Sequence, residues 1–356
     1  MAIPRGCHEI VSSFTSFTPR NDANSMIKKI FLIIVIVIVI FYGYRALFKQ
    51  PEGVSENIEW DIGFSKPFAT DMGLDWKETY LAILNEMQPH YLRLPVYWQD
   101  IEPEQEKYFF EDYDWMVSEA GKRGVKLVLV VGRKLPRWPE CHVPDWAKFL
   151  EEKNQQEKAL DVLAEIVKRY KDSSYVYAWQ VENEPFLAFG ECPDLDAKFL
   201  DKEIALVRSL GGSRSIIVTD SGELSIWIRA AKRADIFGTT MYRTVYSKHT
   251  GYFEYPLPPK FFWLKANFTR LFYPGKPIIV SELQAEPWGP KLIYELPYEE
   301  LERSMTIEKF RDNIEYARKV GFSPVFLWGS EWWYWMKVKY NQPEYWEEAK
   351  TLINIQ

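Results

Sequence analysis

Short apolar segments alternate with longer helix-like segments from residue 58 to the end of the chain, and this alternation restricts the possible folds most. The segment 125–131 contains a run of apolar residues, as expected for a strand that is buried on both faces of a sheet. The predicted strands are 58–64, 90–95, 125–131, 176–181, 215–219, 236–241, 278–281 and 324–328. The predicted helices are 74–88, 111–122, 155–170, 196–210, 299–320 and 344–353, with a shorter one within 261–272.

Eight strand–helix units predict a (β/α)8 TIM barrel of the α/β class, in which functional groups lie at the carboxyl ends of the strands. Helix 155–170 supports this assignment because Ala159, Leu163 and Ile166 recur along one face at helical spacing. A doubly wound open sheet is the structural alternative, but no glycine-rich phosphate loop follows the first strand. The sequence shows no internal repeat and no second globular domain.

The N-terminal region contains a segment that is long and apolar enough to cross a membrane. Residues 30–41 are all aliphatic or aromatic, and the 23 residues of 26–48 match the length that a spanning helix needs. Lys28 and Lys29 precede the apolar run, which predicts a cytoplasmic N-terminus and an extracytoplasmic location for the rest of the chain. An uncleaved signal-anchor is favoured over a cleaved signal peptide, because no small-residue cleavage pattern follows closely.

These features divide the chain into four parts. Residues 1–25 are polar, rich in Ser and Thr and aperiodic, which predicts a disordered tail unless Met26 is the true start. Residues 26–48 form the predicted transmembrane signal-anchor, and residues 49–56, which contain Pro, Gly and Ser, form a linker. Residues 57–356 form the predicted barrel domain.

Charge and composition exclude several kinds of partner. The net charge is −6, which disfavours binding to a polyanion such as nucleic acid. Four His and three Cys residues occur, with no Cys-x-x-Cys or His-x-x-x-His spacing. The sequence therefore predicts neither a metal centre nor a cofactor.

Two glutamates close predicted strands, at positions where a carboxylate is unusual because burying an unpaired charge is costly. Glu184 follows the fourth predicted strand in the run Asn183-Glu184-Pro185, and Glu282 closes the seventh. Cleavage of a glycosidic bond needs such a pair, an acid to protonate the leaving oxygen and a carboxylate to attack or stabilise the sugar cation. Glu182 and Glu286 are competing carboxylates, ranked lower because the first precedes the Asn and the second lies beyond the strand.

Residues at or near the ends of predicted strands carry a family resemblance: Arg93 in Leu92-Arg93-Leu94-Pro95, Asn183, Glu184, Tyr242, Glu282 and Trp328. In these residues the chain resembles clan A of the glycoside hydrolases, the retaining barrel enzymes that include the cellulase-like family 5. The resemblance covers residues 58–335, which is most of the chain beyond the predicted anchor.

The resemblance implies roles for five of these residues. Glu184 would be the acid/base and Glu282 the nucleophile of a retaining mechanism. Asn183 would touch the 2-hydroxyl of the substrate. Arg93 and Tyr242 would lie near the nucleophile and orient it.

Tryptophans supply the remaining candidates for substrate binding, since the chain has 15 of them and an aromatic ring offers a sugar an apolar face. The resemblance implies that Trp328 is the sugar platform. Trp138 follows the third predicted strand, and Trp332 begins the run 332–335, which is too aromatic for an ordinary solvent loop. We expect at least one residue of this run to line a sugar subsite, with packing of the loop onto the barrel rim as the alternative.

Two features depart from the family pattern. Thr240 stands two residues before Tyr242, where members of family 5 usually carry His. Arg133, Lys134 and Arg137 form a basic patch after the third strand, where neutral or aromatic groups are more usual. These departures leave the family within the clan, and the substrate, open.

The sequence therefore predicts a membrane-anchored retaining β-glycosidase that hydrolyses an external poly- or oligosaccharide by double displacement. Transfer of the sugar to another hydroxyl in place of water would use the same two glutamates, so transglycosylation is an alternative. A non-catalytic glycan-binding or cell-surface barrel is a second alternative, because a fold alone does not establish a function.

Two cysteines lie in neighbouring loops at the same predicted end of the barrel. Cys141 follows the third predicted strand and Cys192 the fourth. In an extracytoplasmic domain such a pair can form a disulfide, which would stiffen one wall of the substrate cleft. Two separate thiols are the alternative, and Cys7 lies on the far side of the predicted anchor.

Overall fold

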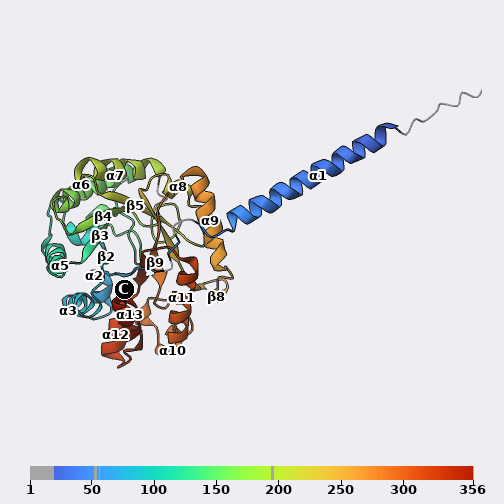
Figure 1. Cartoon of the computed structure of the whole chain (residues 1–356). Coiled ribbons are helices and arrows are strands. Elements are labelled where there is room, and N and C mark those ends of the chain that lie inside the picture. Colours follow the sequence, from blue (N-terminus) through green and yellow to red (C-terminus); the bar gives the residue numbers. More distant parts are fainter. Residues whose placement is uncertain (1–19, 52–53, 56, 194–195, 356) are drawn as a thin grey trace, which may run out of the picture. The chain divides into compact units, whose positions relative to one another are not determined.

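The computed structural model describes residues 20–51, 54–55, 57–193 and 196–355 (Figure 1). The chain separates into two compact units, Met1–Leu47 and Phe48–Gln356. Each unit is described by itself below.

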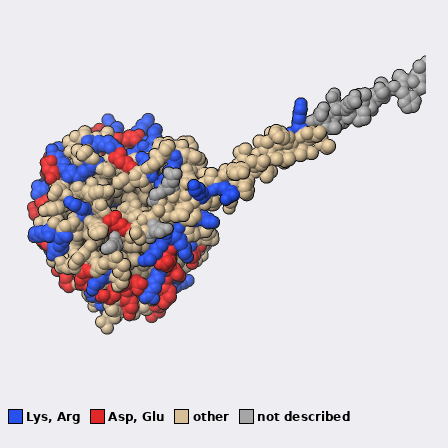
Figure 2. Space-filling view, viewed as in Figure 1, with Lys and Arg blue, Asp and Glu red and all other residues tan. Residues whose placement is uncertain are grey.

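The described part of the first unit is helix α1 (Arg20–Leu47). Its segment Met26–Leu47 contains an 18-residue stretch with a mean hydropathy of 2.6. By length and composition this segment could cross a membrane, but a signal sequence near the N-terminus has the same features. Figure 2 shows the surface of this helix as almost free of charged side chains. Of the predicted disordered tail 1–25, residues 1–19 lie outside the described residues, whereas residues 20–25 already belong to α1.

The second unit is built on a closed barrel of parallel strands (Figure 1). Hydrogen-bonded neighbours follow the order β1-β10-β9-β6-β5-β4-β3-β2 around the barrel. The strands are β1 (Trp60–Gly63), β2 (Tyr91–Pro95), β3 (Lys126–Val131), β4 (Val176–Val181), β5 (Ser215–Asp220), β6 (Ile236–Met241), β9 (Ile278–Gln284) and β10 (Val325–Trp328). The predicted TIM barrel is confirmed, with each predicted strand in its place.

Helices surround the barrel in Figure 1, as the amphipathic pattern of the sequence requires. They are α2 (Lys66–Asp71), α3 (Trp76–Ala82), α4 (Trp98–Ile101), α5 (Glu111–Lys122), α6 (Glu152–Tyr170), α7 (Ala197–Gly211), α8 (Ile228–Ala231), α9 (Pro259–Phe272), α10 (Tyr298–Leu301), α11 (Ile307–Val320), α12 (Ser330–Lys339) and α13 (Glu344–Asn354). Single turns lie at Ile83–Met87 (π), Asp145–Ala147 and Ile293–Glu295 (both 3-10). The predicted helix 299–320 is divided in two because Thr306 caps the start of α11, its hydroxyl oxygen accepting from the Lys309 N–H.

Several elements differ from the sequence-based expectation, among them the short helices α2, α4 and α8, which were not predicted. Strands β7 (Thr244–Ser247) and β8 (Gly251–Glu254) form an antiparallel hairpin after β6 that was not predicted. Residues 330–339 form helix α12, although the run 332–335 was expected to be a loop. Tryptophan side chains of this run are buried in the core, so packing alone accounts for its aromatic character.

A separate apolar cluster fills the barrel interior and fixes the relative positions of the strands that carry the site. It is formed by Val128, Ala178, Ile217, Ile279 and Phe326, which are at most 6% exposed. These side chains come from β3, β4, β5, β9 and β10, so the cluster joins strands that lie far apart in the sequence. Such interior layers make the barrel a packed core and not a pore.

Replacing Phe326 with Ala should lower the free energy of unfolding by about 3–5 kcal/mol, because the substitution removes a large ring from a closely packed interior. Equilibrium denaturation followed by circular dichroism measures the change. Phe149→Ala, at a side chain that is 95% exposed, is the matched control and should have almost no effect. A loss below about 1 kcal/mol in Phe326→Ala would contradict this description of the core.

Candidate active site

The barrel has a cleft of about 600 Å³ at the carboxyl ends of its strands. Its lining includes Trp138, Glu140, Phe189, Tyr242, Glu282, Glu286, Trp288 and Trp328. Glu282 lies within β9, whose extended backbone carries it to the cleft. Glu184 follows β4 after a turn in which Glu182 and Glu184 both have left-handed backbone angles, with φ of 60° and 44°.

Arg93, near the end of β2, holds three groups of the site together. Its Nε donates to Gln180 Oε1 at 2.8 Å, its Nη1 to Glu282 Oε1 at 2.8 Å and its Nη2 to Asn183 Oδ1 at 2.9 Å. Arg93 is only 1% exposed, so its charge depends on these partners. The planar guanidinium therefore fixes the predicted nucleophile and the predicted 2-hydroxyl contact relative to each other.

Each oxygen of Glu282 accepts a hydrogen bond from a different donor. Arg93 donates to Oε1, and the Tyr242 hydroxyl donates to Oε2 at 2.8 Å. Burial, and then the negative charge of Glu282, raise the pKa of Tyr242, so this tyrosine keeps its proton and remains a donor. Two donors on two oxygens match an ionised carboxylate.

Glu184 has very different surroundings. Its backbone N–H donates to Thr219 Oγ1 at 2.9 Å, and its Oε1 accepts from the Thr240 hydroxyl at 2.8 Å. Burial raises the pKa of Glu184 to about 8, the negative charge of Glu282 adds to this effect, and the hydrogen bond from Thr240 opposes it. The carboxyl therefore carries a proton at neutral pH.

Thr240, which stands where family 5 usually has His, thus contacts the predicted acid directly. Its hydroxyl oxygen also accepts from the Gly222 N–H at 3.1 Å, so the hydroxyl proton is directed at Glu184. The residue that departs from the family pattern therefore donates a hydrogen bond to this carboxyl.

The basic patch predicted after β3 is divided among several partners. The Arg133 guanidinium binds Glu152 on α6, at 3.0 Å. The buried Lys134 ammonium donates to the carbonyl oxygens of Glu184, at 3.1 Å, and Leu187, at 2.6 Å. Lys134 therefore supports the loop that carries Glu184.

Arg137 crosses the cleft wall between two carboxylates, Glu286 and Glu331. Its guanidinium carbon lies 3.7 Å from the ring centre of Phe68 and 4.3 Å from that of Trp328, so it stacks on the predicted sugar platform. Burial raises the pKa of Glu286 to about 7, although the charge of Arg137 opposes this shift. Glu286, one of the competing carboxylates, is thus engaged with Arg137.

Glu182, the other competing carboxylate, points into the protein. Its carboxylate accepts from the backbone N–H groups of Arg133 and Lys134, and it is fully buried. It shares this region with Glu203 on α7, whose pKa is raised by burial and by the charge of Glu182. The contacts of Glu182 hold the start of the β3 loop in place.

Two of the three predicted tryptophans reach the cleft. Trp328 and Trp138 line it, and Trp138 is 50% exposed. Trp332 does not join them, because its side chain is 1% exposed and its ring centre lies 4.4 Å from that of Tyr345 in the core.

The structure also brings to the site residues that the sequence did not single out. Phe189 and Trp288 line the cleft with ring centres 5.6 Å apart, and Trp288 also contacts Tyr242, at 5.3 Å. Gln180 binds Arg93 from inside β4, where a polar residue in an otherwise apolar strand was the available signal. Glu140 lines the cleft from the loop after β3.

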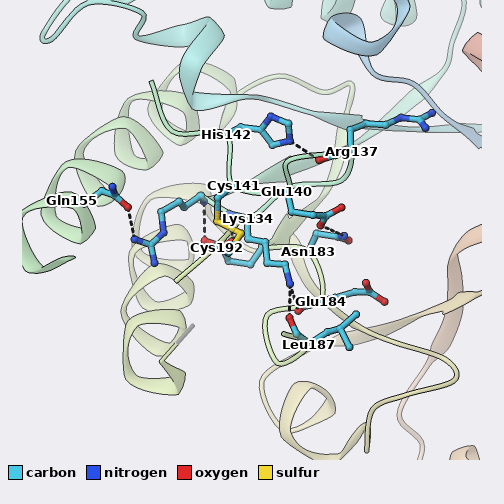
Figure 3. The surroundings of a disulfide bond; sticks show 12 residues. Lys134, Arg137, Glu140, Cys141, His142, Gln155, Asn183, Glu184, Leu187 and Cys192 are labelled. Carbon is cyan, nitrogen blue, oxygen red and sulfur yellow. Dashed lines mark hydrogen bonds between the residues drawn. A yellow bond between two sulfur atoms is a disulfide. The ribbon is translucent and has the colours of Figure 1, made fainter. Parts of the chain in front are cut away.

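Cys141 and Cys192 form a disulfide, with a Cα–Cα distance of 5.3 Å (Figure 3). The predicted cross-link between the loops after β3 and β4 is therefore confirmed. The bond joins the two loops that supply Trp138 and Phe189 to the lining of the cleft. Among the described residues, no group of three His, Cys, Asp or Glu side chains is arranged to hold a metal ion.

A closed (β/α)8 barrel with glutamates at the ends of β4 and β9 is the architecture of clan A of the glycoside hydrolases. Residues 62–332 match the family model described as Cellulase (glycosyl hydrolase family 5), and the chain belongs to this family. No curated protein matches the chain.

Solved structures share the fold at low sequence identity. The cold-adapted β-galactosidase from Rahnella sp. R3 aligns over 85% of this chain and 56% of its own, with a TM-score of 0.54 and 12% identity. GH5_18 from Bifidobacterium longum aligns over 76% of this chain and 69% of its own, with a TM-score of 0.53 and 14% identity. The family 10 endo-β-1,4-xylanase from Gloeophyllum trabeum aligns over 86% of this chain and 99% of its own, with a TM-score of 0.52 and 15% identity. The chain thus spans little more than half the length of the β-galactosidase.

The Glu184 carboxyl should titrate near pH 8 in the resting protein, and this pKa should fall when Glu282 is replaced with Gln. The substitution removes a neighbouring negative charge while keeping the shape of the side chain, so the ionised form of Glu184 becomes less unfavourable. Carbon-13 NMR of labelled glutamate carboxyls, assigned with Glu184→Gln, measures both values. An inflection near pH 4.5 in the unsubstituted chain, or no shift in Glu282→Gln, would contradict the electrostatic description.

Proposed function

We propose that the chain is a membrane-anchored retaining β-glycosidase in which Glu184 is the acid/base and Glu282 the nucleophile. The observation that carries the proposal is the difference between the two carboxyl groups. Glu184 has a raised pKa and a single side-chain donor, whereas Glu282 accepts from Arg93 and Tyr242. Divergent environments of two neighbouring carboxyls are the pattern by which acid and base roles are assigned.

The reaction would proceed in two displacements. In the first, Glu282 attacks the anomeric carbon and Glu184 gives its proton to the leaving oxygen, so a glycosyl–enzyme ester forms. In the second, Glu184 takes a proton from a water molecule, which displaces Glu282 and restores both carboxyl groups. A carboxyl separation of about 5–5.5 Å, as retaining enzymes need, belongs to this proposal.

The aromatic walls of the cleft support a saccharide as the substrate. Trp138, Phe189, Trp288 and Tyr242 follow one another with ring centres 5.3–6.3 Å apart, and Trp328 lies on Arg137. Such rings offer apolar faces to sugars, and polar groups between them bind hydroxyls. Trp138, Asn183 and Trp328 therefore belong to the proposed substrate site, whereas the buried Trp332 does not.

The proposed anchor is helix α1, with the catalytic unit outside the cytoplasm. The span Met26–Leu47 supports a helix in the bilayer, and Lys28 and Lys29 at its start support a cytoplasmic N-terminus. The disulfide Cys141–Cys192 favours an oxidising compartment for the catalytic unit. An external poly- or oligosaccharide is therefore the proposed substrate.

Replacing Glu282 with Gln should lower kcat by at least about 10⁴-fold on any aryl β-glycoside that the full chain hydrolyses, because the amide cannot form the glycosyl ester. NMR of the first product should show that the β configuration is retained. A broad panel of aryl β-glycosides and polysaccharides supplies the substrate. Inverted product would exclude double displacement, and a soluble, folded chain without activity on the whole panel would favour a glycan-binding barrel.

Membranes of cells that make the full chain should retain it through carbonate extraction, because a spanning helix leaves the bilayer only with detergent. Replacing Ile34 and Ile38 with Lys should release the chain or prevent its insertion, since charges at the bilayer centre are costly. Replacing Leu224 and Ile226, exposed residues of the barrel unit, with Lys is the control and should leave extraction unchanged. Release of the unsubstituted chain by carbonate would refute the anchor.

A further inference from the structure

A third carboxyl group enters the cleft beside the two glutamates of the proposed mechanism. Glu140, in the loop after β3, lines the same cleft as Glu282 and is only 7% exposed. Figure 3 shows its carboxyl directed at Asn183, with Glu184 next along the chain. The two displacements described above give Glu140 no task.

The backbone of the loop is shaped to turn Glu140 into the cleft. Glu140 has φ of 72° and Arg137 has φ of 86°, both in the left-handed region that side chains other than glycine seldom adopt. The Glu140 N–H donates to the Arg137 carbonyl at 2.7 Å, and the Leu135 N–H donates to the Glu140 carbonyl at 2.8 Å. An unfavourable backbone that is held by hydrogen bonds on both sides is a feature of functional sites.

The loop after β4 is fitted to the same residue. Gly190 has φ of 87°, and a Cβ atom there would lie 2.5 Å from the Cβ of Glu140, so a larger residue would displace the glutamate. The disulfide Cys141–Cys192 joins the two loops immediately beside this contact. The Glu191 N–H adds a hydrogen bond to the Pro139 carbonyl at 2.9 Å. Both loops thus hold Glu140 in one position.

The hydrogen bonds of the Glu140 carboxyl are incomplete. Oε2 accepts from Asn183 Nδ2 at the long distance of 3.5 Å, whereas Oε1 has no donor among the described residues and keeps some exposed surface in the cleft. The nearby cations are already engaged, Arg93 with Glu282 and Lys134 with two carbonyl oxygens. Oε1 is therefore accessible to a ligand in the cleft, and a ligand that supplies a donor there would complete the hydrogen bonds of this carboxyl.

We propose that Glu140 binds a ring hydroxyl of the sugar that occupies the subsite between Glu184 and Glu282, and that this contact selects among sugars by the configuration of that hydroxyl. The inference rests on the proposed function for the presence of a sugar at this place. It adds a specificity-determining residue that has no part in bond cleavage.

The electrostatics of the loop agree with a neutral hydroxyl as the partner. Burial and the negative charges of Glu282 and Glu184 raise the pKa of Glu140, while the charge of Lys134 opposes the shift. A protonated carboxyl both donates and accepts, as a hydroxyl does. A site that is built to bind a hydroxyl discriminates strongly against a sugar that presents none there, because its buried polar groups are then left unpaired.

The test compares 4-nitrophenyl β-glycosides of glucose, its C4 epimer galactose and its C2 epimer mannose, together with xylose, which lacks the hydroxymethyl group of glucose at C5. Dissociation constants are measured by calorimetry for the full chain in lipid nanodiscs on a Glu282→Gln background, which prevents turnover. On this background, the dissociation constant of the second-best sugar divided by that of the best sugar measures the selectivity. This ratio should fall by about 10- to 100-fold when Glu140 is replaced with Ala. Glu140→Gln, whose amide keeps an acceptor and a donor, should restore most of the ratio.

Glu191→Ala is the matched control, because this exposed carboxylate lies in the opposing loop. It should leave every dissociation constant unchanged. If Glu140→Ala weakens all four sugars by one common factor, or weakens none, Glu140 is a structural residue and the inference is overturned. Turnover is measured separately with Glu282 intact, so a chain that selects sugars through Glu140 but cleaves none would refute the proposed function alone.

Discussion

The buried charge of Arg93 is the interaction on which the arrangement of the cleft depends. One guanidinium from β2 binds Gln180 of β4, Asn183 after β4 and Glu282 of β9, so it fixes elements from widely separated parts of the chain. Binding three separate acceptors from one planar group needs arginine, because a lysine ammonium is a point charge without a planar fork. Loss of Arg93 would also leave Glu282 without its buried counter-charge, which is far more costly than loss of a surface ion pair.

The contact between Arg93 and Glu282 also affects the protonation of Glu184. The negative charge that Arg93 and Tyr242 stabilise on Glu282 is also one cause of the raised pKa of Glu184. Burial in the barrel mouth is the larger cause of the raised pKa of Glu184, and the charge of Glu282 adds to it, so Glu184 keeps its proton. The Cys141–Cys192 disulfide joins the loop that carries Glu140 to the loop that follows β4, so the cross-linked loops also carry the proposed selectivity.

The barrel fold and the positions of the two glutamates were predictable, because both depend on short-range patterns in the sequence. The barrel follows from alternating apolar patterns, and Glu184 and Glu282 were evident as carboxylates that end buried strands. The sequence could not show that Trp332 turns inward on helix α12, because an aromatic run is equally consistent with a core and with a sugar subsite. Glu140 was missed because its place depends on a left-handed backbone and on a facing glycine, which only the packing of two loops reveals.

Trapping of the glycosyl–enzyme ester tests the central claim most directly. A 2-deoxy-2-fluoro glycoside with a good leaving group slows both displacements, the second most, so the ester should accumulate. Mass spectrometry of the digested full chain then locates the added sugar. The expected result is one sugar per chain, on the peptide that contains Glu282, and no label in Glu282→Gln. Label on Glu140 or Glu286, or no label while the same glycoside is hydrolysed, would contradict it.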